Sequence, residues 1–217
     1  TKLHENIYRT VNISLVNEMK MISEKFGLNI NEIINAAKTK PFGFNAFYPG
    51  PGIGGHCIPV DPFYLVWAAK KRNVRTDFIN LSARINDRIS VWMLKIIKKT
   101  LKTNKKSKKK ILAVGLSYKK NVDDTRESPS FKIIEQLLKA NFIVKYYDPF
   151  FKKFPKQRNY KFNIKTIKFN KTSISKFDAV IILTNHDKIN YGLIEKNAKF
   201  IFDTRGVIKK NNNVKYI

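Results

Sequence analysis

The chain has 217 residues, a hydrophobic content of 43%, and 43 Lys and Arg residues against 16 Asp and Glu, for a formal net charge of +27. This length holds one large domain or two smaller ones, and no apolar run reaches the roughly 18–20 residues that a membrane span needs. A single cysteine excludes an internal disulfide and favours a reducing, cytoplasmic location. No signal peptide is recognisable, and because Thr1 opens the chain we expect a piece of a longer protein.

The excess of positive charge has two explanations. Basic residues are spread along the chain among many Ile, Asn and Phe residues, with one cluster at 105–110. An AT-rich genome whose codons drift toward these residue types produces this mixture, and we therefore expect no nucleic-acid partner. The alternative is a basic nucleic-acid-binding or scaffold protein, whose affinity for unrelated duplex DNA would fall steeply with salt.

The first hundred residues are predicted to be helical around one irregular loop. Apolar residues recur every three or four positions from 3 to 26, which predicts a long amphipathic helix that Gly27 ends. Segment 39–62 has five prolines and five glycines, which favours an ordered loop. The other predicted helices are 31–38, one with Asp61 as N-cap and Pro62 as first residue that runs to about 71, and 78–96.

After the basic cluster, which we interpret as a solvated hinge, the pattern changes to short apolar runs alternating with helices. This predicts a doubly wound, Rossmann-like α/β domain, so the fold class is α + α/β with domains at 1–104 and 105–217. The predicted strands are 110–115, 142–147, 178–183 and 199–202, and the predicted helices are 129–139 and 191–197. Ligands of such sheets bind at the carboxyl ends of strands, here 116–120, 184–187 and 203–206.

The segment Gly50-Pro51-Gly52-Ile53-Gly54-Gly55 matches G-x-G-x-x-G but lacks the context of a dinucleotide site. A strand should precede that motif and a helix should open at its end, whereas here a loop precedes it and His56-Cys57-Ile58-Pro59 follows. We expect the glycines to leave backbone N–H groups bare for a ligand. A flexible surface loop is the alternative, which the interleaved prolines and aromatic residues disfavour.

Cys57 is the candidate nucleophile. Pro and Gly on both sides argue against ordinary core packing, and the nearby helix start favours a thiolate. The surrounding loop, 41–65, resembles the catalytic-cysteine segment of the nucleotide-sugar 6-dehydrogenases, the UDP-glucose/GDP-mannose dehydrogenase family. Its Gly-Gly-His-Cys-Ile-Pro-Val-Asp is most similar to the UDP-N-acetylhexosamine branch, especially enzymes acting on UDP-N-acetylglucosamine. Further family motifs match at 2–6, 118–128 and 203–205.

This resemblance implies an all-helical central domain, commonly a dimerisation platform, followed by a UDP-binding domain, and hence a homodimer. The family's NAD-binding domain would precede residue 1, so we expect NAD to bind mainly outside this chain and the isolated chain to be inactive. The implied reaction oxidises the C6 alcohol of a UDP-sugar to a carboxylate with two NAD⁺ and one water. UDP-N-acetylmannosamine or UDP-glucose is an alternative substrate, and a catalytically inert nucleotide-binding fragment is an alternative class.

The resemblance also assigns residue roles. Cys57 would hold the sugar carbon as a thiohemiacetal and then a thioester, Lys2 would stabilise the oxyanion or assist proton transfer, and Asn6 with Asp61 would position the water. The predicted substrate contacts are Tyr48, Gly52, Gly54, Gly55, Tyr118 on the uracil, Lys119 on the diphosphate, and Arg205. Arg126 would reach toward NAD. We expect no metal, because the three histidines and one cysteine show no ligand spacing.

Overall fold

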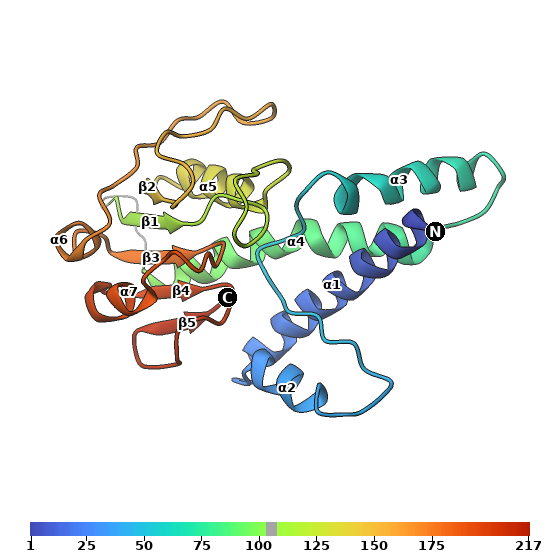
Figure 1. The fold of residues 1–217 in the computed structure, drawn as a ribbon, viewed down its shortest axis with the longest axis horizontal. Coiled ribbons are helices and arrows are strands. Elements are labelled where there is room, and N and C mark those ends of the chain that lie inside the picture. The colour runs from blue at the N-terminus through green and yellow to red at the C-terminus, as the bar shows by residue number, and fades with distance from the viewer. Residues whose placement is uncertain (103–107) are drawn as a thin grey trace.

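The computed structural model describes residues 1–102 and 108–217 of the chain. Its N-terminal part is helical, and Figure 1 shows α1 crossing α4 while α3 runs beside the half of α4 that lies away from the sheet. The helices of this part are α1 (Lys2–Lys25), α2 (Ile30–Ala37), α3 (Cys57–Lys70) and α4 (Asp77–Thr100). Among the described residues, no helix combines the length and the apolar character that crossing a membrane requires.

The end of α1 confirms the prediction that Gly27 stops this helix. Gly27 has a φ of +71°, a left-handed conformation that residues with a side chain rarely adopt. Its N–H donates to Glu24 O at 3.2 Å, and the N–H of Leu28 donates to Ser23 O at 2.9 Å. These two bonds form a Schellman motif, which satisfies carbonyl groups at the helix end and turns the chain toward α2.

The C-terminal part is built on a five-stranded parallel sheet in the order β2-β1-β3-β4-β5. Its elements are β1 (Lys110–Val114), α5 (Pro129–Lys139), β2 (Ile143–Tyr147), α6 (Lys171–Ile174), β3 (Ala179–Ile182), α7 (Tyr191–Asn197), β4 (Ile201–Asp203) and β5 (Val214–Tyr216). The bounds of α5 and α7 are the predicted ones. The sequence did not reveal α6 and β5, because these elements of four and three residues lack the continuous apolar runs that indicated β3 and β4.

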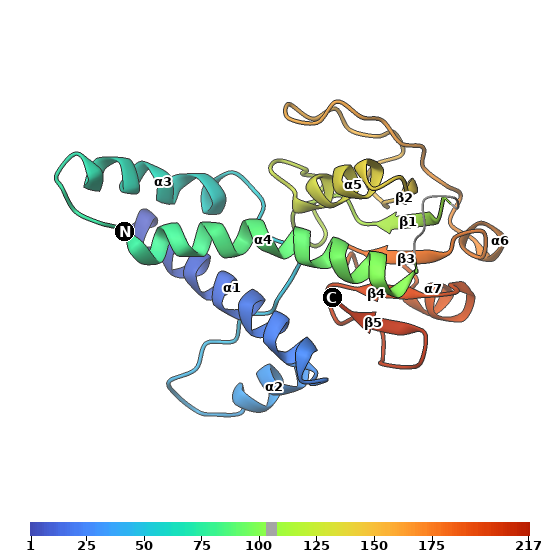
Figure 2. The same cartoon turned by 180° about the vertical axis from the view of Figure 1, so that it is seen from behind.

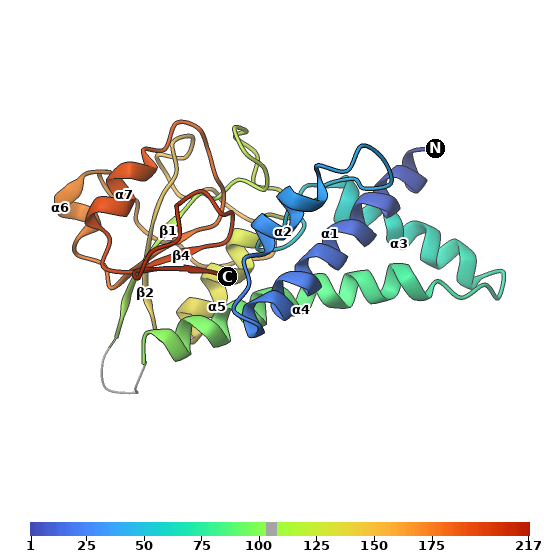
Figure 3. The ribbon, with the colours of Figure 1, turned by 90° about the horizontal axis from the view of Figure 1, so that it is seen from below.

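Helices cover both faces of the sheet. Figure 3 shows α4 and α5 on one side and α6 and α7 on the other. Alternate residues of β1 enter the two cores: Ile111 and Ala113 pack with α4 and α5, whereas Leu112 and Val114 pack with α6 and α7. The predicted doubly wound arrangement is therefore confirmed.

Helix α4 belongs to both halves of the molecule. Figure 2 shows it running from the crossing with α1 to the sheet. Ile89, Met93 and Ile97 in its second half are fully buried in the same core as Ile111 of β1. One core therefore includes residues on both sides of the predicted domain boundary. That boundary, and the first half of the basic cluster interpreted as a hinge, fall at 103–107, outside the described residues, so the division 1–104 and 105–217 stays a prediction.

Lys20 of α1 joins the helical part to the end of the sheet. Its side chain is buried, and its ammonium group donates to Thr204 O at 3.4 Å and to Ile217 O. Burial lowers the pKa of Lys20 to about 7, while the charge of Asp203 opposes this shift and that of Arg205 adds to it. The contact between the two parts therefore includes a lysine that exchanges its proton near neutral pH.

We expect Lys20 to make stability depend on pH. Between the folded-state pKa of about 7 and the ordinary value of 10.5, the unfolded chain binds a proton that the folded chain does not, so stability rises with pH. The rise due to Lys20 is at most about 5 kcal/mol, and Lys20→Met removes it. Urea unfolding of both proteins from about pH 6 to about pH 10 measures the effect. Parallel pH profiles for the two proteins would contradict this expectation.

Candidate active site

Helix α3 begins at Cys57, earlier than the sequence predicted. Asp61 was expected to be the N-cap and Pro62 the first helical residue, but both lie inside the helix. Pro62 has no N–H to donate to Ile58 O, and the hydroxyl group of Thr10 in α1 lies 3.2 Å from that oxygen in its place. Cys57 consequently stands in the first turn of α3, at the end of the helix toward which the backbone N–H groups point.

The first turn of α3 meets the start of α1, which brings together the four residues that the sequence predicted to be catalytic. The buried side-chain amide of Asn6 donates to Oδ2 of Asp61 at 3.0 Å, and Nζ of Lys2 lies 3.4 Å from the same oxygen. The side chain of Asp61 is 13% exposed and that of Lys2 is 72% exposed, so solvent reaches the pair from the lysine side. Asp61, by hydrogen bond and charge, raises the pKa of Lys2, and Cys57 adds to the shift.

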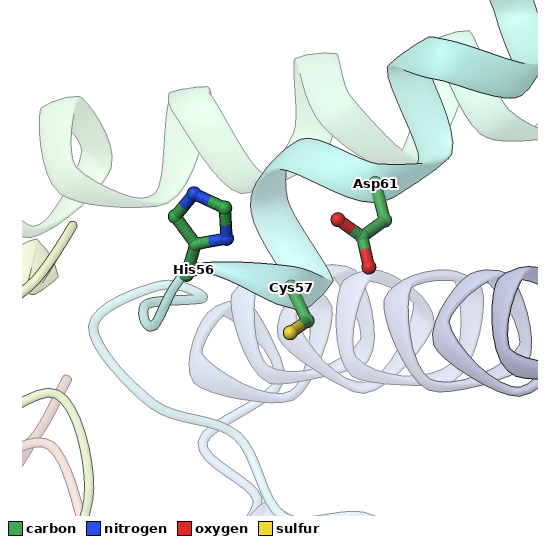
Figure 4. Close-up of side chains that lie close together, drawn as sticks. All are labelled: His56, Cys57 and Asp61. Carbon is green, nitrogen blue, oxygen red and sulfur yellow. The ribbon is translucent and has the colours of Figure 1, made fainter.

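His56, the N-cap residue of α3, lies beside this group. Figure 4 shows His56, Cys57 and Asp61 around the first turn of the helix, with the sulfur and the carboxylate on the side that faces α1. One ring nitrogen, the sulfur and one carboxylate oxygen all lie within 4.8 Å of one another. The expectation that the protein has no metal cofactor stays a prediction.

The glycine-rich loop before Cys57 has fewer free amides than the sequence suggested. Three of its backbone N–H groups donate to acceptors within the protein, so the expectation of bare donors is wrong for them. The bonds run from Gly50 to Asn17 Oδ1 (2.9 Å), from Ile53 to Asn86 Oδ1 (2.8 Å) and from Gly55 to Arg126 O (2.9 Å). The loop is thereby fixed to α1, to α4 and to the C-terminal part.

The glycines also let the C-terminal part approach the loop closely. A Cβ atom on Gly55 would lie 2.9 Å from the ring of Tyr118, and one on Gly54 would lie 2.7 Å from Tyr118 Cβ and 2.9 Å from Glu127 O. A Cβ atom on Gly52 would instead lie 3.0 Å from Pro129 Cβ. Tyr118 therefore packs against Gly54 and Gly55, and the predicted contact of all three glycines with substrate stays a prediction.

We expect Gly55→Ala to loosen this contact. Gly55 has a φ of +84°, and its added methyl group would also meet the Tyr118 ring. Gly43→Ala is the matched control, since Gly43 has a φ of +75° and nothing within 4 Å of an added methyl group. Backbone strain costs either variant about 1 kcal/mol or more, and overpacking costs Gly55→Ala roughly 1–3 kcal/mol in addition. Thermal unfolding measures both losses, and equal losses would contradict the role assigned to Tyr118.

Arg126, which contacts the glycine-rich loop through its backbone, is the second cation near Cys57 after Lys2. Its guanidinium group holds Asp124 through bonds of 2.7 and 3.0 Å and its side chain is 68% exposed. Asp124 raises the pKa of Arg126, with smaller contributions from Tyr118 and Cys57. Lys2 and Arg126 both lie within electrostatic range of the sulfur, so a thiolate at position 57 would face two cations.

Arg205 reaches the other end of the glycine-rich loop. Its Nε donates to Leu183 O at 2.8 Å, and a Cβ atom on Gly50 would lie 2.5 Å from its guanidinium group. Burial lowers the pKa of Arg205 to about 10, and the charge of Asp203 opposes the shift. At neutral pH this side chain is a cation at the carboxyl end of the sheet. Its predicted contact with a phosphate or the sugar of the substrate stays a prediction.

Two other residues predicted to bind substrate, Tyr48 and Lys119, lie in different parts of the molecule. The hydroxyl group of Tyr48 donates to Asn35 Oδ1 of α2 at 2.8 Å, so Tyr48 is attached to the helical part. Lys119 is exposed in the loop after β1, next to Tyr118. Their roles in substrate binding stay predictions.

Sequence reasoning gave no role to His186, which is completely buried at the end of β3. Its Nδ1 accepts a hydrogen bond from the N–H of Asn121 at 2.9 Å, and its Nε2 lies 3.3 Å from Oδ2 of Asp148. The same carboxylate oxygen accepts the N–H of Leu116 at 2.6 Å. The pair therefore fixes both ends of the loop that carries Tyr118. The signal in the sequence was that Asp148 directly follows β2 and that His186 lies in the segment just after β3.

The geometry provides the groups that covalent chemistry through sulfur requires. Cys57 is a nucleophile at a helix start, Lys2 and Arg126 are cations near it, and Asp61 is a carboxylate that an amide holds in place. Aromatic and basic side chains from the strand ends approach the same loop. Such a site suits attack on a carbonyl carbon followed by hydrolysis.

Comparison with known proteins gives the family. The profile of the central domain of the UDP-glucose/GDP-mannose dehydrogenase family matches residues 1–88, and the profile of its UDP binding domain matches residues 112–210. The chain belongs to the UDP-glucose/GDP-mannose dehydrogenase family. The resemblance that the motifs indicated is thereby confirmed, as is the fold class of a helical part followed by an α/β part.

Individual relatives of this dehydrogenase-family chain are about twice as long. It is 35% identical to the UDP-N-acetyl-D-mannosamine dehydrogenase of Methanocaldococcus jannaschii over 96% of its own length and 47% of that protein. It is 33% identical to the NDP-N-acetyl-D-galactosaminuronic acid dehydrogenase of Ralstonia solanacearum, in an alignment that covers 95% of this chain and 47% of that protein. The solved structure of the UDP-D-ManNAc dehydrogenase of Pyrococcus horikoshii aligns with a TM-score of 0.80 at 32% identity. The alignment covers 96% of this chain and 48% of that protein. The chain thus spans about half the length of these relatives.

Proposed function

We propose that this chain carries the catalytic thiol and the UDP-binding part of an NAD-dependent UDP-N-acetylhexosamine 6-dehydrogenase. The observation that carries the proposal is the meeting of Cys57 with Asp61, Asn6 and Lys2 at the contact between α3 and α1. The reaction converts the C6 primary alcohol of the sugar to a carboxylate through two oxidations and one hydrolysis. The protein is expected to work in the cytoplasm.

Cys57 acts on the aldehyde that the first oxidation produces. Its sulfur forms a bond to the carbonyl carbon, giving a thiohemiacetal whose oxygen Lys2 stabilises, and the second oxidation leaves a thioester. Water then adds to the thioester carbonyl carbon while Asp61, held by Asn6, takes its proton. Cleavage of the carbon–sulfur bond releases the carboxylate and restores the thiolate. Because the aldehyde stays covalently bound, it does not escape between the oxidations.

NAD⁺, when bound, accepts a hydride in each of the two oxidations. The G-x-G-x-x-G sequence at 50–55 is a poor fit for its pyrophosphate, since three N–H groups of this segment already donate to protein acceptors. Arg126, whose exposed guanidinium group is within electrostatic range of Cys57, is our candidate in this chain for a contact with the cofactor. We infer that most of the cofactor site comes from residues beyond these 217.

The nucleotide is assigned to the strand ends of the C-terminal part. Tyr118 would stack on the uracil ring, Lys119 would contact the diphosphate, and Arg205 would contact a phosphate or the sugar. Tyr48 and the glycine-rich loop would complete the sugar site. A homodimer is proposed through the helical part, which exposes large apolar side chains such as Phe26, 74% exposed, and Trp67, 61% exposed.

Two epimers are the leading substrates. The motif around Cys57 favours UDP-N-acetylglucosamine, whereas relatives 35% identical to the chain are named for UDP-N-acetyl-D-mannosamine. We therefore place UDP-N-acetylmannosamine first, UDP-N-acetylglucosamine second and UDP-glucose third. Comparing kcat/KM for the three sugars in the intact protein decides among them. A yield near one NADH per sugar, in place of two, would contradict the double oxidation. The isolated chain should bind the nucleotide sugar without reducing NAD⁺.

A further inference from the structure

We propose that His56, Cys57 and Asp61 form a binding site for a soft divalent ion such as Zn²⁺. The ion would bind the sulfur of Cys57 reversibly. One donor atom from each side chain lies within 4.8 Å of the other two. Tetrahedral zinc with nitrogen, sulfur and oxygen ligands holds its donors roughly 3.5 Å apart. Closing that difference requires rotations of the three side chains drawn in Figure 4.

The helix already places two of the donors on one face. Cys57 and Asp61 are separated by one turn of α3, the spacing at which paired metal ligands on a helix meet a single ion. His56 precedes them as the N-cap residue, is exposed, and makes no side-chain hydrogen bond to cap the helix. Its imidazole can therefore turn toward the ion without a helix-capping bond being lost.

Asp61 has an oxygen left for the ion. Asn6 and Lys2 both contact Oδ2, at 3.0 and 3.4 Å. Oδ1 thus remains as the ligand atom, and the bond from Asn6 orients the carboxylate as a supporting residue does in metal sites. The ammonium group of Lys2 repels a dication, but its side chain is 72% exposed and can move into solvent. Lys2 therefore lowers the affinity of the site for the ion but does not prevent binding.

The donor set determines which ions bind. Thiolate and imidazole favour Zn²⁺ and neighbouring transition metals, whereas Mg²⁺ and Ca²⁺ prefer all-oxygen sites. When the ion binds, the Cys57 thiol releases its proton to solvent and a zinc–sulfur bond forms, so no electrons are transferred. The three protein ligands leave a fourth position for water. A thiolate bound in this way cannot attack an aldehyde, so the ion acts as a reversible inhibitor.

The test measures the chemical reactivity of Cys57 in the intact protein, without using catalysis. Iodoacetamide alkylation of the peptide containing Cys57 is followed by mass spectrometry with and without Zn²⁺. We expect micromolar Zn²⁺ to slow alkylation at least about tenfold, EDTA to restore the rate, and excess Mg²⁺ to have no effect. An unchanged rate with Zn²⁺, or equal protection by Mg²⁺, would overturn the proposal.

Three variants separate this site from adventitious binding. His56→Asn, which keeps a good N-cap residue, should raise the Zn²⁺ concentration needed for protection about tenfold or more, while Lys2→Met should lower it. His4→Asn is the matched control at an exposed histidine of α1 and should change nothing. Protection that survives His56→Asn, or disappears in His4→Asn, would refute the ligand set.

Only the inhibitory effect rests on the proposed function. If zinc protects Cys57 but Cys57→Ser keeps full dehydrogenase activity, the metal site stands and the proposed function fails. If zinc gives no protection but Cys57→Ser is inactive, the metal proposal fails and the function stands.

Discussion

Replacing Cys57 with serine in the intact dehydrogenase lowers kcat for acid formation about 1000-fold or more, equivalent to roughly 4 kcal/mol of barrier. A serine hydroxyl group is not ionised at neutral pH, so the nearby charges of Lys2 and Arg126 have no anion to stabilise. KM for the nucleotide sugar should change little, because the proposed UDP contacts lie at the strand ends. Steady-state NADH formation measures both constants.

Cys57→Ala serves as the companion variant and should lose as much activity as Cys57→Ser. Both proteins should unfold at close to the wild-type temperature, since Cys57 is only partly buried. Acid formation by either variant at the wild-type rate would contradict covalent catalysis through sulfur. Equal and large losses of stability would instead show that the residue serves folding.

Asp61→Asn is expected to slow hydrolysis without preventing oxidation. The variant keeps the size of the side chain and a contact for Asn6 but loses the base that takes the proton from water, which lowers kcat about 10²–10⁴-fold. Both oxidations precede hydrolysis, so a stopped-flow trace should show a burst near two NADH per site, followed by a slow steady rate.

Asp77→Asn is the matched control, since it makes the same carboxylate-to-amide change at an exposed residue of α4. It should behave like the wild-type protein. If Asp61→Asn reduces the burst itself as strongly as the steady rate, Asp61 acts before the thioester forms and the assigned role is wrong. A wild-type steady rate in Asp61→Asn would remove Asp61 from the mechanism.

The elements that the sequence predicted best carry their own end signals. Helix α5 begins at Pro129 after Ser128, whose side chain accepts the N–H of Ser130, and α7 begins after Asn190, which accepts the N–H of Leu193. Both caps are local, so a short stretch of sequence contains them. Apolar runs such as 110–115 likewise identify buried strands because burial on both faces removes the alternation of polar residues.

The start of α3 was predicted wrongly because its cause lies in another helix. Prolines at 59 and 62 suggested that no helix could precede Pro62, yet Ile58 O lies 3.2 Å from the hydroxyl group of Thr10 in α1, which also donates to Asn6 O at 2.8 Å. The same limit applies to the glycine-rich loop. Whether Gly54 and Gly55 face a ligand or the ring of Tyr118 depends on how two distant segments pack, and periodicity does not encode that.

The candidate site was predictable to the extent that motifs carry it. Lys2, Asn6, Cys57 and Asp61 were named from matching segments, and the structure brings them together. The pairing of His186 with Asp148 and the approach of His56 to Asp61 were not foreseen, because they depend on the directions of side chains. Spacing along the chain gives only the positions of their backbones.

The covalent intermediate can be observed directly in the protein with Asp61→Asn. This variant is mixed with UDP-N-acetylmannosamine, or its epimer, and excess NAD⁺, quenched in acid, digested and examined by mass spectrometry. We predict that the peptide containing Cys57 gains the mass of the acyl nucleotide sugar and that a thiol-free nucleophile such as hydroxylamine removes it. Acid formation with an unmodified Cys57 peptide throughout the reaction would contradict the account.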